Sequence, residues 1–463
     1  MVMNKNNTRM IKMTQVCIIG AGPSGITAAK NCIENGISFD IFEKNDKVGG
    51  NWVFNSKTGH SSVYENTHII SSKTMSEYED FPMPDHYPDY PRHDQLQQYF
   101  ENYAKHFGVF KQIKFHHQID HVSKNDDGTW LVEYTDNHGK KHQKTYPYLM
   151  VCNGHHWQPK YPEYEGKFTG TWMHSHDFKA VTDEWRGKRI LVIGAGNSAC
   201  DVAVEASRVS KDIYLSMRSP QWFVPKFMLG YPADIVVKAI ENLPARVRSK
   251  LLTKIVKVFT GNYADFGLPV NDKPMLTQHP TANSDFIEFV RHGKIKPKPA
   301  VKKLSGKKIE FVDGTVEQFD IVCCCTGFWT VFPFFDPEFI NFQHVEKLPL
   351  YRKMMHAEHE NLYFIGLFQP LGCIWPASDH QANLACQEIL GRYTRPHDMK
   401  KAIQHELENP HHQFIGGQRH AAEVDYNDFR TELVAELKTA GIIIPERKAK
   451  VSITKFIGSL LTA

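Results

Sequence analysis

The sequence predicts an α/β fold with two parallel-sheet domains, the second inserted into the first. Two observations carry this prediction. An apolar, β-branched run near residue 16 ends in Gly-x-Gly-x-x-Gly, and a second such run near residue 189 ends in a similar motif. Each predicts a buried parallel strand that turns sharply into a helix. With 463 residues, the chain is long enough for two or three domains.

The first motif lies in the stretch VCIIGAGPSG, residues 16–25. Gly20 permits the tight turn, Gly22 lets the backbone approach a pyrophosphate, and Gly25 lets the next helix, expected over residues 26–34, pack against the strand. Phosphates bind the free amides at such a helix N-terminus. Pro23 and Ser24 complete the predicted phosphate-binding turn.

An acidic residue follows the second predicted strand, residues 38–42. Glu43 lies 18 residues after Gly25, close to the spacing of roughly 20 expected for an acid that binds a ribose 2′-hydroxyl. The first motif therefore predicts a site for FAD.

The second motif, GAGNSA, begins at Gly194 and has Ala199 in place of the third glycine, which is an accepted variant. Arg218 lies 24 residues after Gly194, and Glu43 lies 23 residues after Gly20, so the two side chains occupy equivalent positions. An arginine there pairs with a 2′-phosphate, which favours NADPH over NADH. The alternative for Arg218 is a solvated cation at a strand end.

The remaining elements follow from apolar periodicity and turn residues. We expect helices over residues 92–107, 285–292, 379–392 and 425–440, strands over 113–134, 148–152, 307–312, 315–319, 320–328 and 362–366, and a loose polar leader over 1–13. The aromatic, proline-rich stretch 53–91 is predicted to form long loops that cover a ligand.

Composition excludes several classes of protein. A net charge of +4 without a basic tail indicates no nucleic-acid partner. Nine cysteines without a Cys-x-x-Cys pair, and a start without an apolar core, indicate reduced thiols and a cytoplasmic location. The histidine pairs 155/156 and 174/176 lack a third ligand nearby, so no metal site is expected.

Residues 235–259 have apolar side chains at helical spacing beside several Lys and Arg. This pattern fits a helix on a membrane surface. We favour a helix packed on its own protein.

The stretch FTGTWMHSHDFK, residues 168–179, lies between the two glycine motifs. It matches Phe-x-Gly-x-x-x-His-x-x-x-(Tyr or Phe)-Lys, and with it the chain resembles the flavin-containing monooxygenases from about residue 16 to 392. Four short matches extend the resemblance: Phe42-Glu43-Lys44, Gly49-Gly50-Asn51-Trp52, Gly194 to Asp201, and Cys325-Thr326-Gly327-Phe328.

The resemblance implies a reaction and a set of site residues. NADPH reduces FAD, and a C4a-hydroperoxyflavin transfers oxygen to a soft nitrogen or sulfur nucleophile such as an amine, a thioether or indole. Solvent must be excluded, and the loops over residues 64–90 are candidate lids. The residues expected to bind the cofactors are Gly20, Gly22, Pro23, Ser24, Gly25, Glu43, Lys44, Gly50, Asn51, Trp52, Ser71, Ser72, Gly194, Gly196, Asn197, Ser198, Ala199, Asp201, Arg218, Ser219, Thr326 and Gly327; the fingerprint adds Phe168, Gly170, His174 and Phe178.

The resemblance also implies an FAD domain over residues 1–169 and 326–463, an NADPH domain over 170–325 and, at family level, a homodimer. His174 is expected to orient the domains rather than to act as a base. One position departs from the family pattern: Ile70 stands where an Asn usually contacts flavin and NADP⁺. Ser71, Ser72 or a backbone amide replaces it, or the oxygenating intermediate is shorter-lived. No catalytic residue is assigned.

Three other functions stay open. Baeyer–Villiger oxygenation of ketones uses the same cofactors, but its specialised enzymes usually have Trp where Phe178 stands. A flavin reductase or NADPH oxidase would insert no oxygen, and the missing Cys pair argues against a disulfide reductase. A non-catalytic NADPH sensor could use the same fold.

Overall fold

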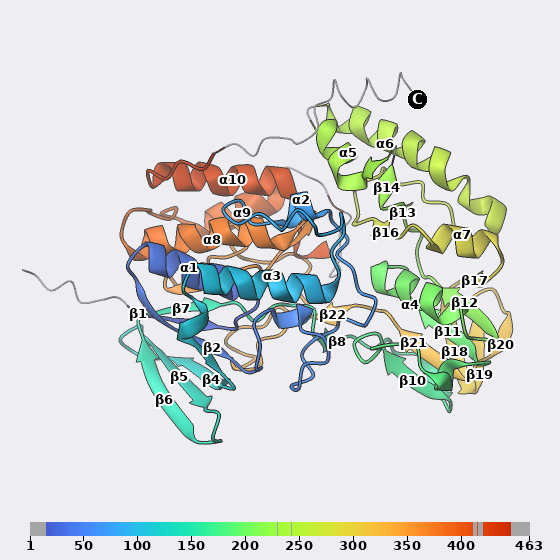
Figure 1. The fold of residues 1–463 in the computed structure, drawn as a ribbon, viewed down its shortest axis with the longest axis horizontal. Helices are drawn as coiled ribbons and strands as arrows, with labels where there is room; N and C mark the ends of the chain where they lie inside the picture. Colours follow the sequence, from blue (N-terminus) through green and yellow to red (C-terminus); the bar gives the residue numbers. More distant parts are fainter. Residues whose placement is uncertain (1–14, 229, 242, 411–413, 415–419, 446–463) are drawn as a thin grey trace, which may run out of the picture.

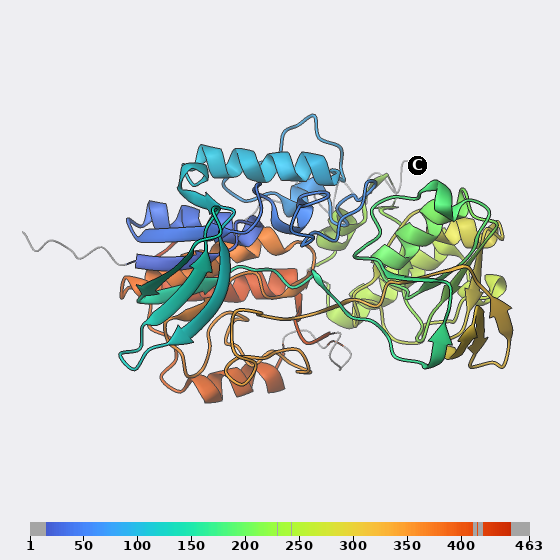
Figure 2. The same cartoon turned by 90° about the horizontal axis from the view of Figure 1, so that it is seen from below.

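The computed structural model describes residues 15–228, 230–241, 243–410, 414 and 420–445; the predicted leader lies outside them. Two bodies lie side by side along the long axis of the molecule (Figures 1 and 2). The larger body contains segments from both ends of the described chain, and the smaller body contains its middle. The chain therefore leaves the first body, builds the second, and returns.

The larger body is built on a parallel sheet in the order β23-β7-β1-β2-β3. Its strands are β1 (Gln15–Ile19), β2 (Ser38–Glu43), β3 (Ile113–Phe115), β7 (Tyr148–Val151) and β23 (Leu362–Phe364). Alternate side chains of a strand point to opposite faces. Val16 and Ile18 of β1 accordingly pack in the core under the helices, whereas Cys17 and Ile19 pack in a second core on the other face.

Helices cover the first of these faces. They are α1 (Pro23–Glu34), α2 (Lys73–Ser76), α3 (His93–His106), α8 (Ile374–Ile389), α9 (Met399–Glu408) and α10 (Tyr426–Thr439). An antiparallel sheet of β4 (Gln118–Lys124), β5 (Trp130–Thr135) and β6 (Lys141–Tyr146) adjoins the opposite face. The sequence analysis missed β6 because its residues are polar and only Tyr146 is buried.

The smaller body has a parallel sheet in the order β10-β21-β11-β12-β17. These strands are β10 (Thr171–His174), β11 (Arg189–Ile193), β12 (Asp212–Ser216), β17 (Ile295–Lys298) and β21 (Ile321–Cys324). Helices α4 (Asn197–Ser207) and α7 (Phe286–Arg291) belong to one face. On the other lies the sheet of β9 (Glu165–Phe168), β18 (Val301–Gly306), β19 (Lys308–Phe311) and β20 (Val316–Gln318). The predicted α/β fold with two Rossmann-like sheets is confirmed.

A long segment between β12 and β17 forms the outer part of the smaller body. It contains β13 (Phe223–Val224), β14 (Phe227–Met228), β15 (Tyr231–Pro232), α5 (Ala233–Ala239), α6 (Ala245–Thr260), the 3-10 turn η4 (Tyr263–Phe266) and β16 (Thr281–Ala282). The pattern over residues 235–259 thus belongs to two helices. Pro244 immediately precedes α6, and a proline begins a helix more readily than it continues one.

Short elements complete the fold: β8 (Gln158–Pro159) pairs with β22 (Phe328–Trp329), β24 (Gln369–Leu371) pairs with β25 (Glu423–Asp425), and 3-10 turns span Gly50–Trp52, Phe110–Gln112 and Asp183–Trp185. Two helices begin earlier than expected, α1 at Pro23 instead of Ile26 and α8 at Ile374 instead of Asp379. Each has a proline in its first turn, where the missing amide hydrogen costs little. In the described part of the chain, no helix is long and apolar enough to cross a membrane.

Candidate active site

The first glycine loop is closely packed between two strands and a neighbouring turn. Gly20 has φ +100°, and a Cβ atom there would lie 2.8 Å from the Cys152 carbonyl oxygen. A Cβ on Gly25 would lie 1.8 Å from the Gly20 oxygen, and one on Gly22 would lie 3.5 Å from Gly50 Cα. Within the described residues, no side chain caps the N-terminus of α1. The loop therefore offers backbone amides at close approach, which fits a pyrophosphate.

Glu43 is buried beside this loop at the end of β2. Its Oε2 accepts a hydrogen bond from the Ala21 amide at 2.8 Å, and its Oε1 accepts one from the Asn45 amide at 2.8 Å. Burial nevertheless raises the pKa of the Glu43 carboxyl above its ordinary value. A carboxylate oxygen accepts more than one hydrogen bond, so Glu43 fits a ribose hydroxyl donor.

The returning end of the chain contacts the same loop. A Cβ on Gly366 would lie 2.1 Å from Ser24 Oγ, and the Gly366 amide donates to Gln381 Oε1 at 2.8 Å. Helix α8 begins nearby: the same Cβ would lie 3.5 Å from Ile374. The sequence analysis identified the strand before Gly366 but missed both Gly366 and Gln381; a glycine directly after a buried strand was the available signal.

Asn51 and Trp52 of the Gly-Gly-x-Trp turn, and Lys44 directly after β2, make different contacts. Asn51 Oδ1 accepts hydrogen bonds from the Ser62 amide at 2.7 Å and from its hydroxyl at 2.8 Å. Trp52 packs edge-on against Trp375 of α8, with ring centroids 5.7 Å apart. Burial lowers the pKa of Lys44, whose Nζ lies 5.2 Å from the centre of the Trp157 ring.

The segment with the unusual Ile70 is joined to the smaller body. The Ser72 amide donates to Asp234 Oδ2 of α5 at 2.6 Å, and burial raises the pKa of Asp234. The Ser71 hydroxyl lies 2.8 Å from the Ser76 hydroxyl, and Ser76 donates to the Ser72 carbonyl. Nothing in the sequence indicated that Asp234, more than 160 residues away, reaches this segment.

The second glycine loop repeats the first. Gly194 has φ +135°, and a Cβ there would lie 2.4 Å from the Cys325 carbonyl oxygen. A Cβ on Gly196 would meet no described atom within 4 Å. Within the described chain, no side chain caps α4, and Asn197 Oδ1 accepts from the Ala282 amide at 2.8 Å. The space beside Gly196 and the free amides of α4 fit a second pyrophosphate.

Arg218 and Ser219 are exposed just after β12. Burial lowers the pKa of Lys160, and the positive charge of Arg218 adds to this effect, so the two cations are neighbours. Lys160 Nζ lies 3.9 Å from the centre of the Trp329 ring, and the Lys160 carbonyl accepts from the Thr326 hydroxyl at 2.5 Å. Such a cationic edge fits a 2′-phosphate. The sequence analysis missed Lys160.

The fingerprint residues lie in and beside β9 and β10, where the chain enters the smaller body. A Cβ on Gly170 would lie 2.4 Å from the Asp320 carbonyl oxygen. His174 ends β10; burial lowers its pKa to about 4, and its ring packs on Phe328 at 5.3 Å. Phe178 is buried against Tyr64, 5.4 Å between centroids. Phe168 is buried in the core between the two sheets of this body.

The aromatic segment 61–91 joins the two bodies. The Tyr64 hydroxyl donates to Asp201, which also accepts from Asn283 at 2.6 Å; burial raises the pKa of Asp201. Asn66 donates to Glu205 at 3.1 Å. Together with the Ser72–Asp234 bond, these contacts place the segment across the junction of the two bodies, beside Asp201. Val202, the residue after Asp201 in α4, is buried in the core of the smaller body.

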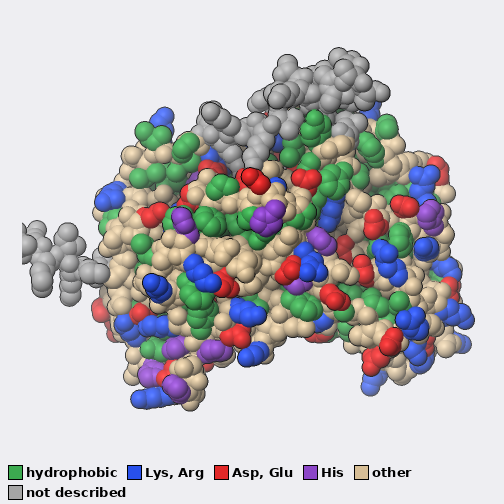
Figure 3. Space-filling model, in the orientation of Figure 1, with side chains coloured by type: hydrophobic (Ala, Val, Ile, Leu, Met, Phe, Trp, Pro, Cys, Tyr) green, Lys and Arg blue, Asp and Glu red, His purple; other side chains and the backbone are tan. Residues whose placement is uncertain are grey.

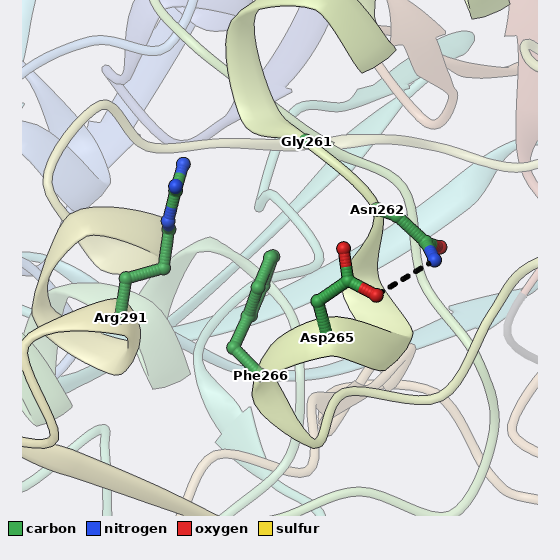
Figure 4. Close-up of a pocket in the computed structure, with 5 residues that line it drawn as sticks. All are labelled: Gly261, Asn262, Asp265, Phe266 and Arg291. Atoms are coloured by element: carbon green, nitrogen blue, oxygen red, sulfur yellow. Dashed lines mark hydrogen bonds between the residues drawn. The ribbon is translucent and has the colours of Figure 1, made fainter.

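Two hollows lie elsewhere. A cavity of about 210 Å³ is lined by Gly261, Asn262, Asp265, Phe266 and Arg291, with Asn262 donating to Asp265 at 3.1 Å (Figure 4). A groove of about 680 Å³ runs along α6. Neither is lined by a predicted site residue. Among the described residues, no group of three His, Cys, Asp or Glu side chains is arranged to hold a metal ion.

Comparison with known proteins identifies the family. The model of the flavin-binding monooxygenase-like family matches residues 13–446. The chain is 35% identical over 440 residues to flavin-containing monooxygenase 5 of Rattus norvegicus, covering 90% of this chain and 82% of the relative. It is 33% identical over 446 residues to dimethylaniline monooxygenase [N-oxide-forming] 2 of the same species, covering 91% and 82%. The structure of S-allyl-L-cysteine S-oxygenase from Allium sativum has the same fold, with a TM-score of 0.70 at 18% identity over 97% of this chain and 93% of that one.

Proposed function

The chain belongs to the flavin-containing monooxygenase family, and on that premise we propose that its substrates are small molecules with a soft nitrogen or sulfur nucleophile. It is an oxidoreductase that uses FAD, NADPH and molecular oxygen. The N-oxide-forming relative and the S-oxygenase of the same fold support both classes of nucleophile.

One observation carries the assignment of cofactors to sites. Two helices, α1 and α4, begin directly after closely packed glycine loops. The strand that follows each helix differs in the charge at its end: buried Glu43 ends β2, and exposed Arg218 follows β12. An acid accepts from a free 2′-hydroxyl, and an arginine pairs with a 2′-phosphate. We therefore assign FAD to the larger body and NADPH to the smaller one.

The residues that would hold each cofactor follow from this assignment. FAD would contact the loop from Gly20 to Gly25, Glu43, Lys44, the Gly50–Trp52 turn and Ser71–Ser72; NADPH would contact the loop from Gly194 to Ala199, Arg218, Ser219, Thr326 and Gly327. We add Gly366 and the N-terminus of α8 to the first site and Lys160 to the second. Bound flavin supplies the hydride acceptor and the chemistry that activates oxygen.

The chain itself supplies position and exclusion of water. The lid segment, tied to the smaller body through Tyr64 and Ser72, covers the junction where the two cofactors would meet. His174 stays neutral at physiological pH because burial lowers its pKa to about 4. Its position at the end of β10, packed against Phe328, supports an orienting role for this ring rather than a role as a base.

We also propose the domain bounds, the oligomeric state and the cellular location. We place the FAD domain at residues 1–169 and 326–463, with the NADPH domain between them. The resemblance favours a homodimer, which sedimentation velocity tests, and the reduced cysteines favour a cytoplasmic location, which cell fractionation tests.

The proposed function is tested by reducing the yellow holoprotein with NADPH under anaerobic conditions, adding oxygen, and following the flavin spectrum. We expect a transient band that belongs to neither oxidised nor reduced flavin and that decays faster when a tertiary amine or a thioether is added. Direct return to oxidised flavin with one peroxide per NADPH would contradict oxygenation. Faster decay with a ketone alone would point to Baeyer–Villiger chemistry instead.

A further inference from the structure

Lys179, the last residue of the fingerprint, binds backbone carbonyls at the junction of the two bodies. On the face shown in Figure 3, Lys and Arg side chains lie on the surface, interspersed with Asp and Glu; Lys179 is half-buried instead. Its Nζ donates to the Ser61 carbonyl at 2.7 Å, to the His176 carbonyl at 2.8 Å and to the Val63 carbonyl at 3.4 Å. Because an ammonium group has three N–H donors, these three carbonyls use its full donor capacity.

Further contacts hold residues 61–65 to the smaller body. The Glu65 amide donates to the Lys179 carbonyl at 2.8 Å, so this lysine binds the segment through both its side chain and its backbone. Phe178 packs on both Tyr64 and Trp185, with ring centroids 5.4 Å apart in each pair. Phe178 and Trp185 belong to the core of the smaller body. The end of the fingerprint therefore fixes residues 61–65 to this body.

The same segment contacts the larger body at the turn assigned to FAD. The Ser61 hydroxyl donates to the Asn51 carbonyl at 2.7 Å, and the Ser62 amide donates to Asn51 Oδ1 at 2.7 Å. Ser61 is buried. It accepts from Lys179 through its carbonyl and donates to Asn51 through its hydroxyl, so this one residue links the smaller body to the FAD-binding turn.

We propose that Lys179 is a positioning residue: acting through Ser61, it fixes the smaller body and its bound NADPH in register with the FAD-binding turn. This inference rests on the proposed function, in which a hydride leaves NADPH, forming NADP⁺, and reduces FAD. Hydride transfer needs the reacting atoms within roughly 3.5 Å of each other, so a change of register slows it. NADPH affinity depends instead on the second glycine loop and Arg218, which lie outside this path.

The first test is anaerobic stopped-flow reduction of the FAD-loaded protein over a series of NADPH concentrations. Lys179→Met keeps an unbranched side chain and removes the three donors. It should lower the rate constant for flavin reduction at saturating NADPH about tenfold, because small misplacements of the reacting atoms have effects of this size or larger. The Kd for NADPH should stay that of the parent. Lys179→Arg, which can still donate to carbonyls, should restore most of the rate.

The second test is hydrogen exchange of the FAD-loaded protein, followed by mass spectrometry, and it needs no turnover. In Lys179→Met, amide protection over residues 61–66 should fall about ten to a hundredfold, as expected when a charged hydrogen bond that holds a segment is lost. The matched control is Lys347→Met. Lys347 is an exposed lysine whose Nζ donates to the Leu407 carbonyl at 2.5 Å within the larger body, so its loss should change neither exchange over residues 61–66 nor flavin reduction.

Several results would overturn the proposal. Faster exchange with an unchanged reduction rate would mean that Lys179 holds the segment without setting the register, and a higher Kd with an unchanged rate would assign Lys179 to NADPH binding. If Lys179→Met loses its FAD or unfolds, Ser61→Ala cuts the same path at its other end and should slow reduction in the same way; normal reduction in that variant would contradict the path. If NADPH fails to reduce even the parent, the proposed function is wrong, and the exchange data still decide whether Lys179 holds residues 61–66.

Discussion

Glu406 is expected to make the stability of the larger body fall as pH rises through the neutral range. The carboxylate lies on α9 against the Arg352 guanidinium, at 2.5 Å, and also accepts from the Arg352 amide at 3.1 Å. Glu432 and Glu436 share the same guanidinium, at 3.1 and 2.9 Å. Burial is the largest effect on Glu406, and together with the charge of Glu432 it outweighs the attraction of Arg352. The pKa of Glu406 is raised from 4.5 to about 7.

The direction of this pH dependence follows from the linkage between proton binding and folding. The folded state binds this proton more tightly than the unfolded chain, so the contribution is fully present below about pH 4.5 and is lost as pH rises to about 7. A difference of about 2.5 pKa units corresponds to about 3 kcal/mol. Glu406→Gln keeps the shape of the protonated carboxyl and cannot ionise. The variant should therefore lose none of this free energy over the same pH range.

The measurement is urea unfolding of the FAD-loaded protein at intervals between pH 4.5 and 7.5, with unfolding followed by far-UV circular dichroism. The free energy of unfolding of Glu406→Gln minus that of the parent should grow by about 3 kcal/mol across this range. Glu408→Gln, an exposed acid on the same helix, is the control and should follow the parent. Parallel pH profiles for the parent and Glu406→Gln would refute the reasoning.

Four further changes test the site. Arg218→Gln should raise the KM for NADPH by about ten to a hundredfold in steady-state kinetics without changing the KM for NADH, because it removes charged hydrogen bonds to the 2′-phosphate. Equal effects on the two KM values would mean that Arg218 is a solvated cation. Ile70→Asn should lower the peroxide formed per NADPH and prolong the lifetime of the transient flavin band in stopped-flow spectra. No change in either quantity would mean that Ile70 does not shorten the lifetime of this species. Tyr64→Phe leaves Asp201 without one hydrogen bond, at a cost of about 1–3 kcal/mol. The lid segment should then exclude water less well, so the peroxide released per NADPH should rise while FAD content stays constant. Unchanged peroxide release would mean that this contact does not hold the lid. Gly194→Ala places a Cβ 2.4 Å from the Cys325 carbonyl oxygen. NADPH titration should therefore show weakened binding while the protein keeps its FAD. Normal NADPH affinity would be incompatible with the packing of this loop.

The glycine loops could be predicted from the sequence because their geometry is local. Gly20 and Gly194 adopt φ of +100° and +135° directly after a buried strand, a conformation that favours glycine. The strands themselves are visible because their apolar residues must fill cores on both faces. The charge difference between Glu43 and Arg218 is likewise a matter of counting residues from each loop. Fold class, cofactor type and family membership all follow from such short-range patterns.

Only the tertiary structure decided which distant residues complete the site. Asp234 reaches Ser72, Tyr64 reaches Asp201, and Gly366 packs against Ser24. The partners in these pairs are more than a hundred residues apart, and no periodicity links them. Position along the chain does not determine which loops meet when two bodies fold against each other.

The helix α6 shows the same limit at a single element. Its apolar spacing predicts a helix with an apolar face, but Leu252 and Val256 enter the core while Val247 and Val258 remain exposed. Sequence periodicity reports that a side chain is apolar, and not whether the protein covers it. Burial depends on what packs against the helix, and that is set by the three-dimensional arrangement of the whole chain.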